Sequence, residues 1–172
     1  MGVNVTASAE GSGPVSERDR ATVHEQLGRP PRGLRAVAAR DEDGDPAVVQ
    51  THPRLENGTP FPTLYYLTSP RLVSKVSALE SEGLMRTMTE RLGEDEQLAA
   101  EYRRAHESYL AERDAIEPLG TDVSAGGMPD RVKCLHVHVA HALAKGPGVN
   151  PFGDEALRLI AERAGAAPRS DG

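Results

Sequence analysis

Apolar residues change their spacing once along the chain, near Pro70. Before it, three short apolar runs lie between turn-forming residues, at residues 34–39, 47–51 and 63–68. Short runs that contain β-branched and aromatic residues and are bounded by glycine, proline or aspartate are typical of strands. After Pro70 the apolar residues recur every three or four positions, which indicates helices. The order of these elements predicts an α+β fold, in which a small antiparallel sheet of about three strands packs against a mostly helical C-terminal half.

Capping residues and glycines set the limits of the predicted helices. Ser16 is the expected N-cap of a first helix, and Gly28 ends it. In the C-terminal half, the spacing predicts five further helices at residues 72–83, 84–93, 94–117, 129–145 and 154–164. The longest of them carries one apolar stripe, which suits packing against another helix. A partner that docks on this long helix is one hypothesis for the protein's role.

Composition narrows the class of protein. The formal net charge is -6, and the chain has four tyrosines, two phenylalanines and no tryptophan. This balance argues against binding to nucleic acid or to an anionic membrane. No apolar run approaches the roughly 20 residues that cross a bilayer, and the N-terminal segment lacks the features of a secretory signal. A single cysteine cannot form an internal disulfide, so we expect a cytoplasmic protein.

The two ends of the chain have little apolar surface to bury. We therefore expect disordered tails at residues 1–14 and 165–172. Between them, residues 15–164 have the length of one domain with a core of its own.

Residues able to carry chemistry gather in the stretch 126–157, which holds the single cysteine and three of the six histidines. A proline suits the first turn of a helix and a glycine its end, so we expect one helix over 129–145. On an ideal helix, Cys134, His138 and His141 lie within about 60° of one another. This spacing would direct a thiol and two imidazoles to one point beside the helix.

Such a face suits more than one kind of chemistry. Thiolate and imidazole bind soft divalent metals such as zinc, and an imidazole beside a thiol can act as its base. His136 lies about 160° from Cys134 on the helix. If the segment were a strand, its alternation would instead group Cys134, His136 and His138 and exclude His141. A purely structural role is the third alternative, because a buried cysteine behaves as a small apolar residue.

Three segments of the chain resemble domain-of-unknown-function family 501, a family of small bacterial proteins. They are QLGRPPRGLRAVAAR at 26–40, TPFPTLYYLTSPRLVSKVSALESEG at 59–83 and GGMPDRVKCLHVHVAHALAKGPGVNPFGDEAL at 126–157. The resemblance covers roughly residues 16–160. It implies no activity, because the family has no established one.

The resemblance also implies positions for a metal site. Relatives often carry cysteine or histidine in two turns where this chain has two aspartates and a serine. Together with the cysteine–histidine segment, those side chains would form a zinc or iron–sulfur site in the relatives. Oxygen donors move a site away from soft metals, which implies that the site is weakened or lost here. The positions implied in this chain are Cys134, His136 and His141, with Asp41, Asp43 and Ser69 as accessory positions.

No complete catalytic motif stands out in the sequence. We therefore expect a non-catalytic binding or regulatory module for an unknown protein or small ligand, with its site around residues 126–153. The alternative is a metal-dependent or thiol-dependent enzyme that uses Cys134 with His138 or His141. Four arginines near the first predicted strand form a basic cluster that could meet an acidic partner or a phosphate: Arg29, Arg32, Arg35 and Arg40.

Overall fold

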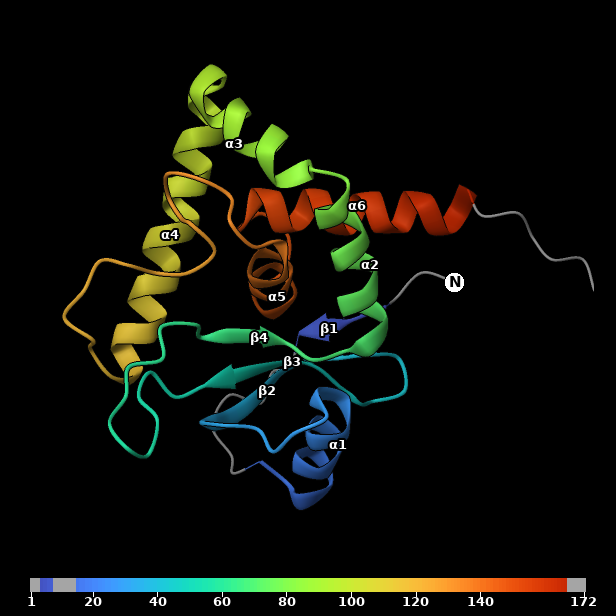
Figure 1. Cartoon of the computed structure of the whole chain (residues 1–172), viewed down its shortest axis with the longest axis vertical. Helices are drawn as coiled ribbons and strands as arrows, with labels where there is room; N and C mark the ends of the chain where they lie inside the picture. Colours follow the sequence, from blue (N-terminus) through green and yellow to red (C-terminus); the bar gives the residue numbers. More distant parts are fainter. Residues whose placement is uncertain (1–3, 8–14, 167–172) are drawn as a thin grey trace, which may run out of the picture.

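The computed structural model describes residues 4–7 and 15–166 (Figure 1). Its elements, in chain order, are β1 (Thr6–Ala7), α1 (Glu17–Leu27), β2 (Leu34–Arg40), β3 (Pro46–Thr51), β4 (Tyr65–Leu67), α2 (Pro70–Ser81), α3 (Leu84–Glu94), α4 (Glu96–Ile116), α5 (Leu135–Lys145) and α6 (Pro151–Ala166). The four strands form an antiparallel sheet in the order β1-β2-β3-β4. Helix α1 lies against one face of this sheet and α5 against the other (Figure 1). The predicted α+β fold is confirmed.

Successive side chains of the sheet serve two separate cores, as the two-residue period of a strand requires. On β3, Val48 belongs to the large core under α5, whereas Val49 belongs to a small core under α1. The small core contains little else than Val23 of α1 and Leu34 of β2. The helical half is therefore packed on one face of the sheet, and among the described residues α1 is the only helix on the other face.

Capping residues and the spacing of apolar residues correctly predicted most of the helices and strands. The Ser16 hydroxyl accepts a hydrogen bond from the amide of Asp19 at 3.1 Å, and Gly28 ends α1 with a positive φ of 72°. The three predicted strands and the helices at 72–83, 84–93 and 94–117 occur with small changes of their ends. Among the described residues, no helix is long and apolar enough to span a membrane.

The N-terminal strand was not expected. Residues Thr6 and Ala7 pair with Arg40 and Ala39 of β2, inside the predicted tail 1–14. Two residues are too few to carry a hydrophobic period, so nothing in the pattern marks them.

The other predicted ends are only partly covered by the structure. Residues 1–3 and 8–14 of the predicted N-terminal tail lie outside the described residues, as do residues 167–172 of the predicted C-terminal one. The last helix, predicted over 154–164, runs from Pro151 to Ala166. The first two residues of the predicted C-terminal tail therefore belong to α6.

The predicted helix over 129–145 is wrong in its first part, because α5 begins only at Leu135. The preceding glycine-rich segment forms tight turns, in which Gly126 has a φ of 63° and its carbonyl accepts a hydrogen bond from the amide of Lys133 at 2.7 Å. A proline is as suitable for a turn as for the start of a helix, and here it serves the turn. Cys134 consequently precedes the helix as its N-cap residue.

Candidate functional site

The sequence-predicted site residues separate into two groups. Cys134 and His136 are partly exposed at the start of α5, whereas His138 and His141 are fully buried. The structure does not bring Cys134 together with the two buried histidines, because the thiol lies before the helix rather than on one of its faces.

A cysteine–histidine–glutamate cluster forms where the start of α5 meets α2. The Sγ atom of Cys134 lies 3.9 Å from Nδ1 of His136, and the same nitrogen lies 2.7 Å from Oε1 of Glu80. One ligand atom from each of the three side chains lies within 4.8 Å of the others. In the part of the chain that the structure describes, no other group of three such side chains comes this close.

Helix α2 holds the imidazole from two sides. Ser77 and Glu80 are three residues apart on α2 and therefore share one face of the helix. The hydroxyl of Ser77 lies 3.1 Å from Nε2 of His136, opposite the nitrogen that faces Glu80. The amide of Leu135 donates to Oε1 of Glu80 at 3.2 Å and fixes the carboxylate. The ring is thus oriented with Nδ1 toward the carboxylate and the thiol.

Cys134 and His136 shift each other's pKa. Burial raises the pKa of the Cys134 thiol, but His136 and the backbone amide of Val137 together outweigh it, so the pKa falls below its ordinary value. The contact with Cys134 raises the pKa of His136, burial opposes it, and Glu80 adds to the rise, which brings the pKa to about 9. Near neutral pH the cluster therefore holds a protonated imidazole beside a thiol whose pKa is lowered.

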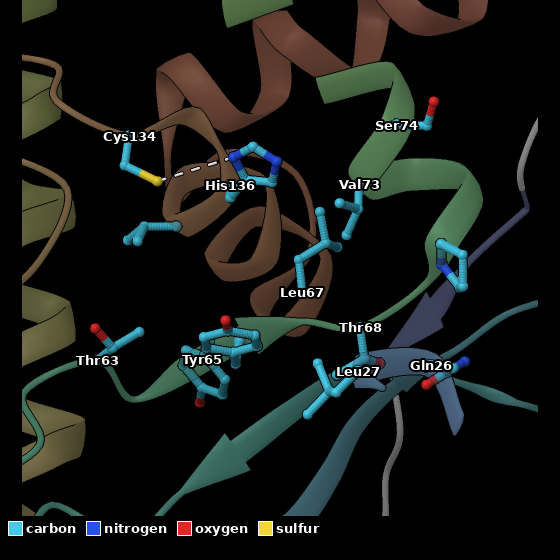
Figure 2. A pocket seen from close by; sticks show the side chains of 13 residues that line it. Gln26, Leu27, Thr63, Tyr65, Leu67, Thr68, Val73, Ser74, Cys134 and His136 are labelled. Carbon is cyan, nitrogen blue, oxygen red and sulfur yellow. Dashed lines mark hydrogen bonds between the residues drawn. The ribbon is translucent and has the colours of Figure 1, made fainter. Parts of the chain in front are cut away.

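The cluster opens onto a pocket of about 720 Å³ at the outer edge of β4 (Figure 2). In Figure 2, Cys134 and His136 lie on one side of this pocket and Gln26 lies on the far side. Most of the lining is apolar, and its apolar side chains come from α1, β4, α2 and α5: Leu27, Tyr65, Tyr66, Leu67, Val73 and Val137. Apolar walls with a few polar groups are typical of small-molecule sites.

His138 and His141 belong instead to a buried polar network centred on Asn150. The side-chain nitrogen of Asn150 lies 3.0 Å from Nδ1 of His138 and 3.2 Å from Nδ1 of His141. Its side-chain oxygen accepts a hydrogen bond from the amide of Gly153 at 3.0 Å, which fixes the orientation of the amide group. Asn150 must therefore donate to both imidazoles, and each ring carries its proton on Nε2.

The two histidines differ in how their second ring nitrogen is satisfied. The Nε2 atom of His138 lies 3.2 Å from the carbonyl oxygen of Gly126 and 3.0 Å from the hydroxyl of Tyr102. The Nε2 atom of His141 has no hydrogen-bond partner among the described residues, and its ring packs between Tyr65 and Tyr109. Burial lowers the pKa of each histidine to about 4. Both are therefore neutral and hold α5 to its neighbours.

The accessory positions do not join the cluster. Asp41 accepts hydrogen bonds from the amides of Asp43 and Asp45 at 2.9 and 3.0 Å, so its carboxylate closes the β2–β3 turn. Ser69 is buried and is the N-cap of α2. These side chains stabilise a turn and a helix start, and none of them adds a ligand atom to the cluster.

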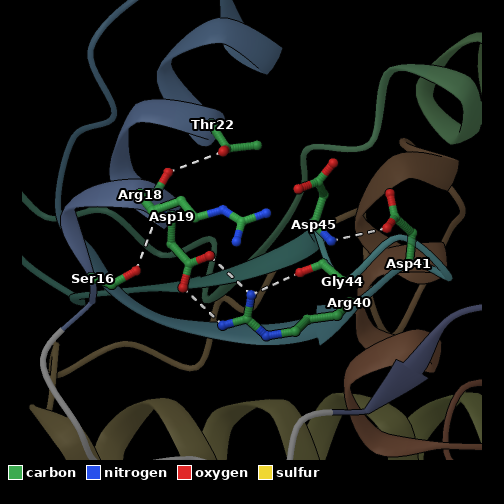
Figure 3. A network of polar contacts seen from close by, with 8 residues as sticks. All are labelled: Ser16, Arg18, Asp19, Thr22, Arg40, Asp41, Gly44 and Asp45. Carbon is green, nitrogen blue, oxygen red and sulfur yellow. Dashed lines mark hydrogen bonds and ion pairs between the residues drawn. The ribbon is translucent and has the colours of Figure 1, made fainter.

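The β2–β3 turn also anchors α1 (Figure 3). The guanidinium group of Arg40 donates to both carboxylate oxygens of Asp19 at 2.9 and 2.8 Å, and to the carbonyl of Gly44 at 3.0 Å. The hydrogen bond from Arg40 lowers the pKa of Asp19, against the effect of burial. This corner of the fold is therefore occupied by structural contacts.

Sequence reasoning missed Glu80. No spacing along the chain links position 80 with positions 134 and 136, and only the packing of α2 beside α5 brings them together. A glutamate on a helix face gives no local signal by which it could be selected from other surface carboxylates.

The molecule is thus an α+β protein with one thiol–imidazole–carboxylate cluster at the mouth of a pocket. It belongs to the family described as "Protein of unknown function (DUF501)", whose family model matches residues 37–158, well over half of the chain. This match confirms the resemblance noted in the sequence, and the matched segment contains Glu80, Cys134 and His136. No curated protein and no solved structure matches the chain.

Proposed function

We propose that the protein binds a divalent transition-metal ion of the zinc class through Cys134, His136 and Glu80. We propose further that it binds a small ligand beside that ion, in the pocket of about 720 Å³ at the outer edge of β4. The observation that carries the proposal is the approach of the three ligand atoms to within 4.8 Å of one another. The expected non-catalytic binding role is retained, but the site extends from the 126–153 segment to α2.

The donor set supports a zinc-class ion. Thiolate sulfur, imidazole nitrogen and carboxylate oxygen are all ligands of Zn²⁺, and sites with three protein ligands keep a fourth position open for water or another ligand. A site with one thiolate also disfavours magnesium and calcium, which take oxygen ligands. Two of the three proposed ligands, Cys134 and His136, line the pocket, so a ligand there could reach the ion.

Ser77 completes the argument for a metal on Nδ1 of His136. A metal at Nδ1 needs the lone pair of that nitrogen, so the ring proton must be on Nε2. The Ser77 hydroxyl lies 3.1 Å from Nε2 and can accept that proton's hydrogen bond. A hydrogen bond to the second ring nitrogen is the usual support of a metal-bound histidine, because it fixes both the tautomer and the ring.

A thiol-dependent activity is the second candidate, and the lowered pKa of Cys134 favours it. In a cysteine–histidine–acid arrangement, however, one ring nitrogen serves the thiol and the other serves the carboxylate. Here Cys134 and Glu80 both face Nδ1 of His136. Three donor atoms within 4.8 Å of one another suit a shared ion better than a proton relay.

Zinc titration of the metal-free chain tests the proposal. We expect one zinc ion per chain. The loss of a residue that only supports a metal ligand weakens metal affinity by roughly 10-fold to 100-fold. Glu80→Gln removes a ligand itself, so it should weaken zinc binding at least as much. Affinity is measured by competition with a chromophoric chelator, on protein that carries no affinity tag. Since binding displaces protons from the thiol and the imidazole, affinity should also rise with pH.

The matched control is Glu94→Gln, which removes an exposed carboxylate from another helix. It should leave zinc affinity unchanged, and circular dichroism should show both variants folded. Absence of stoichiometric zinc, or equal affinity in the Glu80 and Glu94 variants, would contradict the metal site. If bound zinc did not slow the alkylation of Cys134, that result would favour the thiol-dependent alternative.

A further inference from the structure

A second pocket, of about 530 Å³, lies on the face of the sheet that α1 covers only in part. Helix α1 ends at Leu27, and beyond it Leu34 of β2 and Val49 of β3 form an apolar floor. Leu55 and Phe61, from the loop between β3 and β4, also line the pocket. Beyond the end of α1, this part of the sheet therefore forms the wall of a pocket that is largely apolar.

Two arginines line this pocket without compensating charge. Arg29 and Arg32 are exposed, and among the described residues neither makes an ion pair or a side-chain hydrogen bond. The lining contains no aspartate or glutamate. Glu56 lies with Arg32 in an adjoining depression, but forms no ion pair with it in the described part of the chain.

The other two arginines of the basic cluster are already engaged. Arg35 donates to the side-chain oxygen of Gln50 at 2.5 Å, and Arg40 forms an ion pair with Asp19 at 2.8 Å. The predicted cluster of four therefore divides into a structural pair and a pair that faces the pocket. The pocket-facing pair is the part of the cluster with guanidinium groups available to a ligand.

The backbone between Arg29 and Arg32 is stiff. Pro30 and Pro31 separate the two arginines, and a proline ring fixes its own φ and restricts the preceding residue. Pro31 also lines the pocket. Because the segment has few alternative conformations, less conformational entropy is lost when a ligand orders the two side chains.

We infer that this pocket, here termed the Arg29–Arg32 pocket, binds an amphiphilic anion, meaning a carboxylate or phosphate group carried on an apolar body. A guanidinium group donates paired hydrogen bonds to either kind of anion. The apolar floor removes the body of the ligand from water, at about 25 cal/mol per Å² buried. A volume of about 530 Å³ suits a small molecule.

The net charge of the protein does not oppose this site strongly. At -6 the chain as a whole repels anions. Charges more than about 8 Å apart are largely screened at physiological ionic strength, however, so the two arginines at the pocket dominate the local field. Exposed arginines hold a bare anion only weakly. The ligand therefore also needs an apolar body that the pocket can bury.

The test uses naphthyl probes with different head groups. The probes are 2-naphthyl phosphate, 2-naphthoate and the neutral 2-naphthol, with inorganic phosphate as competitor. The chain has no tryptophan, so tryptophan emission does not overlap that of the probes. We expect both anionic probes to bind more tightly than 2-naphthol. The double variant Arg29→Gln with Arg32→Gln should lower the affinity for both anionic probes at least roughly tenfold, because hydrogen bonds to charged groups are lost. Binding of 2-naphthol should not change.

The matched control is the double variant Arg18→Gln with Arg20→Gln, which removes the same charge from two exposed positions of α1. It should change the affinity for the anionic probes less than about twofold, as expected for screened surface charge. Phe61→Ala should weaken all three naphthyl probes. Equal losses in the two arginine variants, inorganic phosphate that competes as well as 2-naphthyl phosphate, or no binding of either anionic probe would each overturn the inference. None of these results depends on the metal site.

Discussion

Replacing Gly153 by alanine is expected to lower the free energy of unfolding by about 3 kcal/mol or more, the upper range for overpacking. Gly153 lies in α6 and faces α5. A Cβ atom at this position would collide with the carbonyl oxygen of His138 and would lie 2.7 Å from the Cβ of Ala142. Alanine is favoured over glycine in a helix by only about 1 kcal/mol. The two helices would have to separate, so the collision outweighs the gain in helix propensity.

The same helix provides the control. At Gly165 an added Cβ would meet no atom within 4 Å. Gly165→Ala should therefore leave packing unchanged and should not lower the free energy of unfolding, because alanine is the better helix former. Urea unfolding followed by circular dichroism measures both variants. If Gly153→Ala were as stable as Gly165→Ala, the close contact between α5 and α6 would be wrong.

Lowering the pH from 7 to 5 is expected to reduce the free energy of unfolding by roughly 3 kcal/mol. Burial lowers the pKa of His138 and His141 to about 4, whereas an unfolded histidine titrates near 6.5. Between these values the unfolded state binds protons that the folded state does not. The stability from the two neutral histidines is therefore complete above pH 6.5 and is lost as the pH falls toward 4.

His136 acts in the opposite direction. Its pKa is raised to about 9, so its contribution is complete below pH 6.5 and is lost as the pH rises through 9. Between pH 7 and 5, His136 offsets only part of the stability lost from His138 and His141, because most of the change in its own contribution falls above pH 7.

Urea unfolding midpoints over this pH range measure the effect on stability. A stability that stays constant between pH 7 and 5 would contradict neutral, buried histidines.

The fold could be predicted where the signals are local. Ser16 and Gly28 limit α1 through a side-chain cap and a left-handed glycine, and both lie in the sequence next to the element they end. The start of α5 could not be predicted in this way, because a proline after two glycines suits a turn as well as a helix. Strand β1 is two residues long and depends on pairing with β2, a contact between distant parts of the chain.

The candidate site could be located to a stretch of the chain but not assembled. The sequence indicated Cys134 and the histidines that follow it, and the angular argument then depended on where the helix starts. With the start at Leu135, the thiol lies outside the helix, and His136 rather than His138 comes nearest to it. Glu80 approaches them only through the packing of two helices, and the sequence alone does not encode that contact in any local spacing.

The most direct test of the metal centre is the X-ray absorption spectrum of the zinc-loaded chain. The proposed ligand set predicts one sulfur neighbour at about 2.3 Å and nitrogen or oxygen neighbours at about 2.0–2.2 Å. It also predicts that Cys134→Ser removes the sulfur neighbour. A spectrum with only nitrogen and oxygen neighbours, or a sulfur neighbour that persists in Cys134→Ser, would contradict a zinc site built on Cys134, His136 and Glu80.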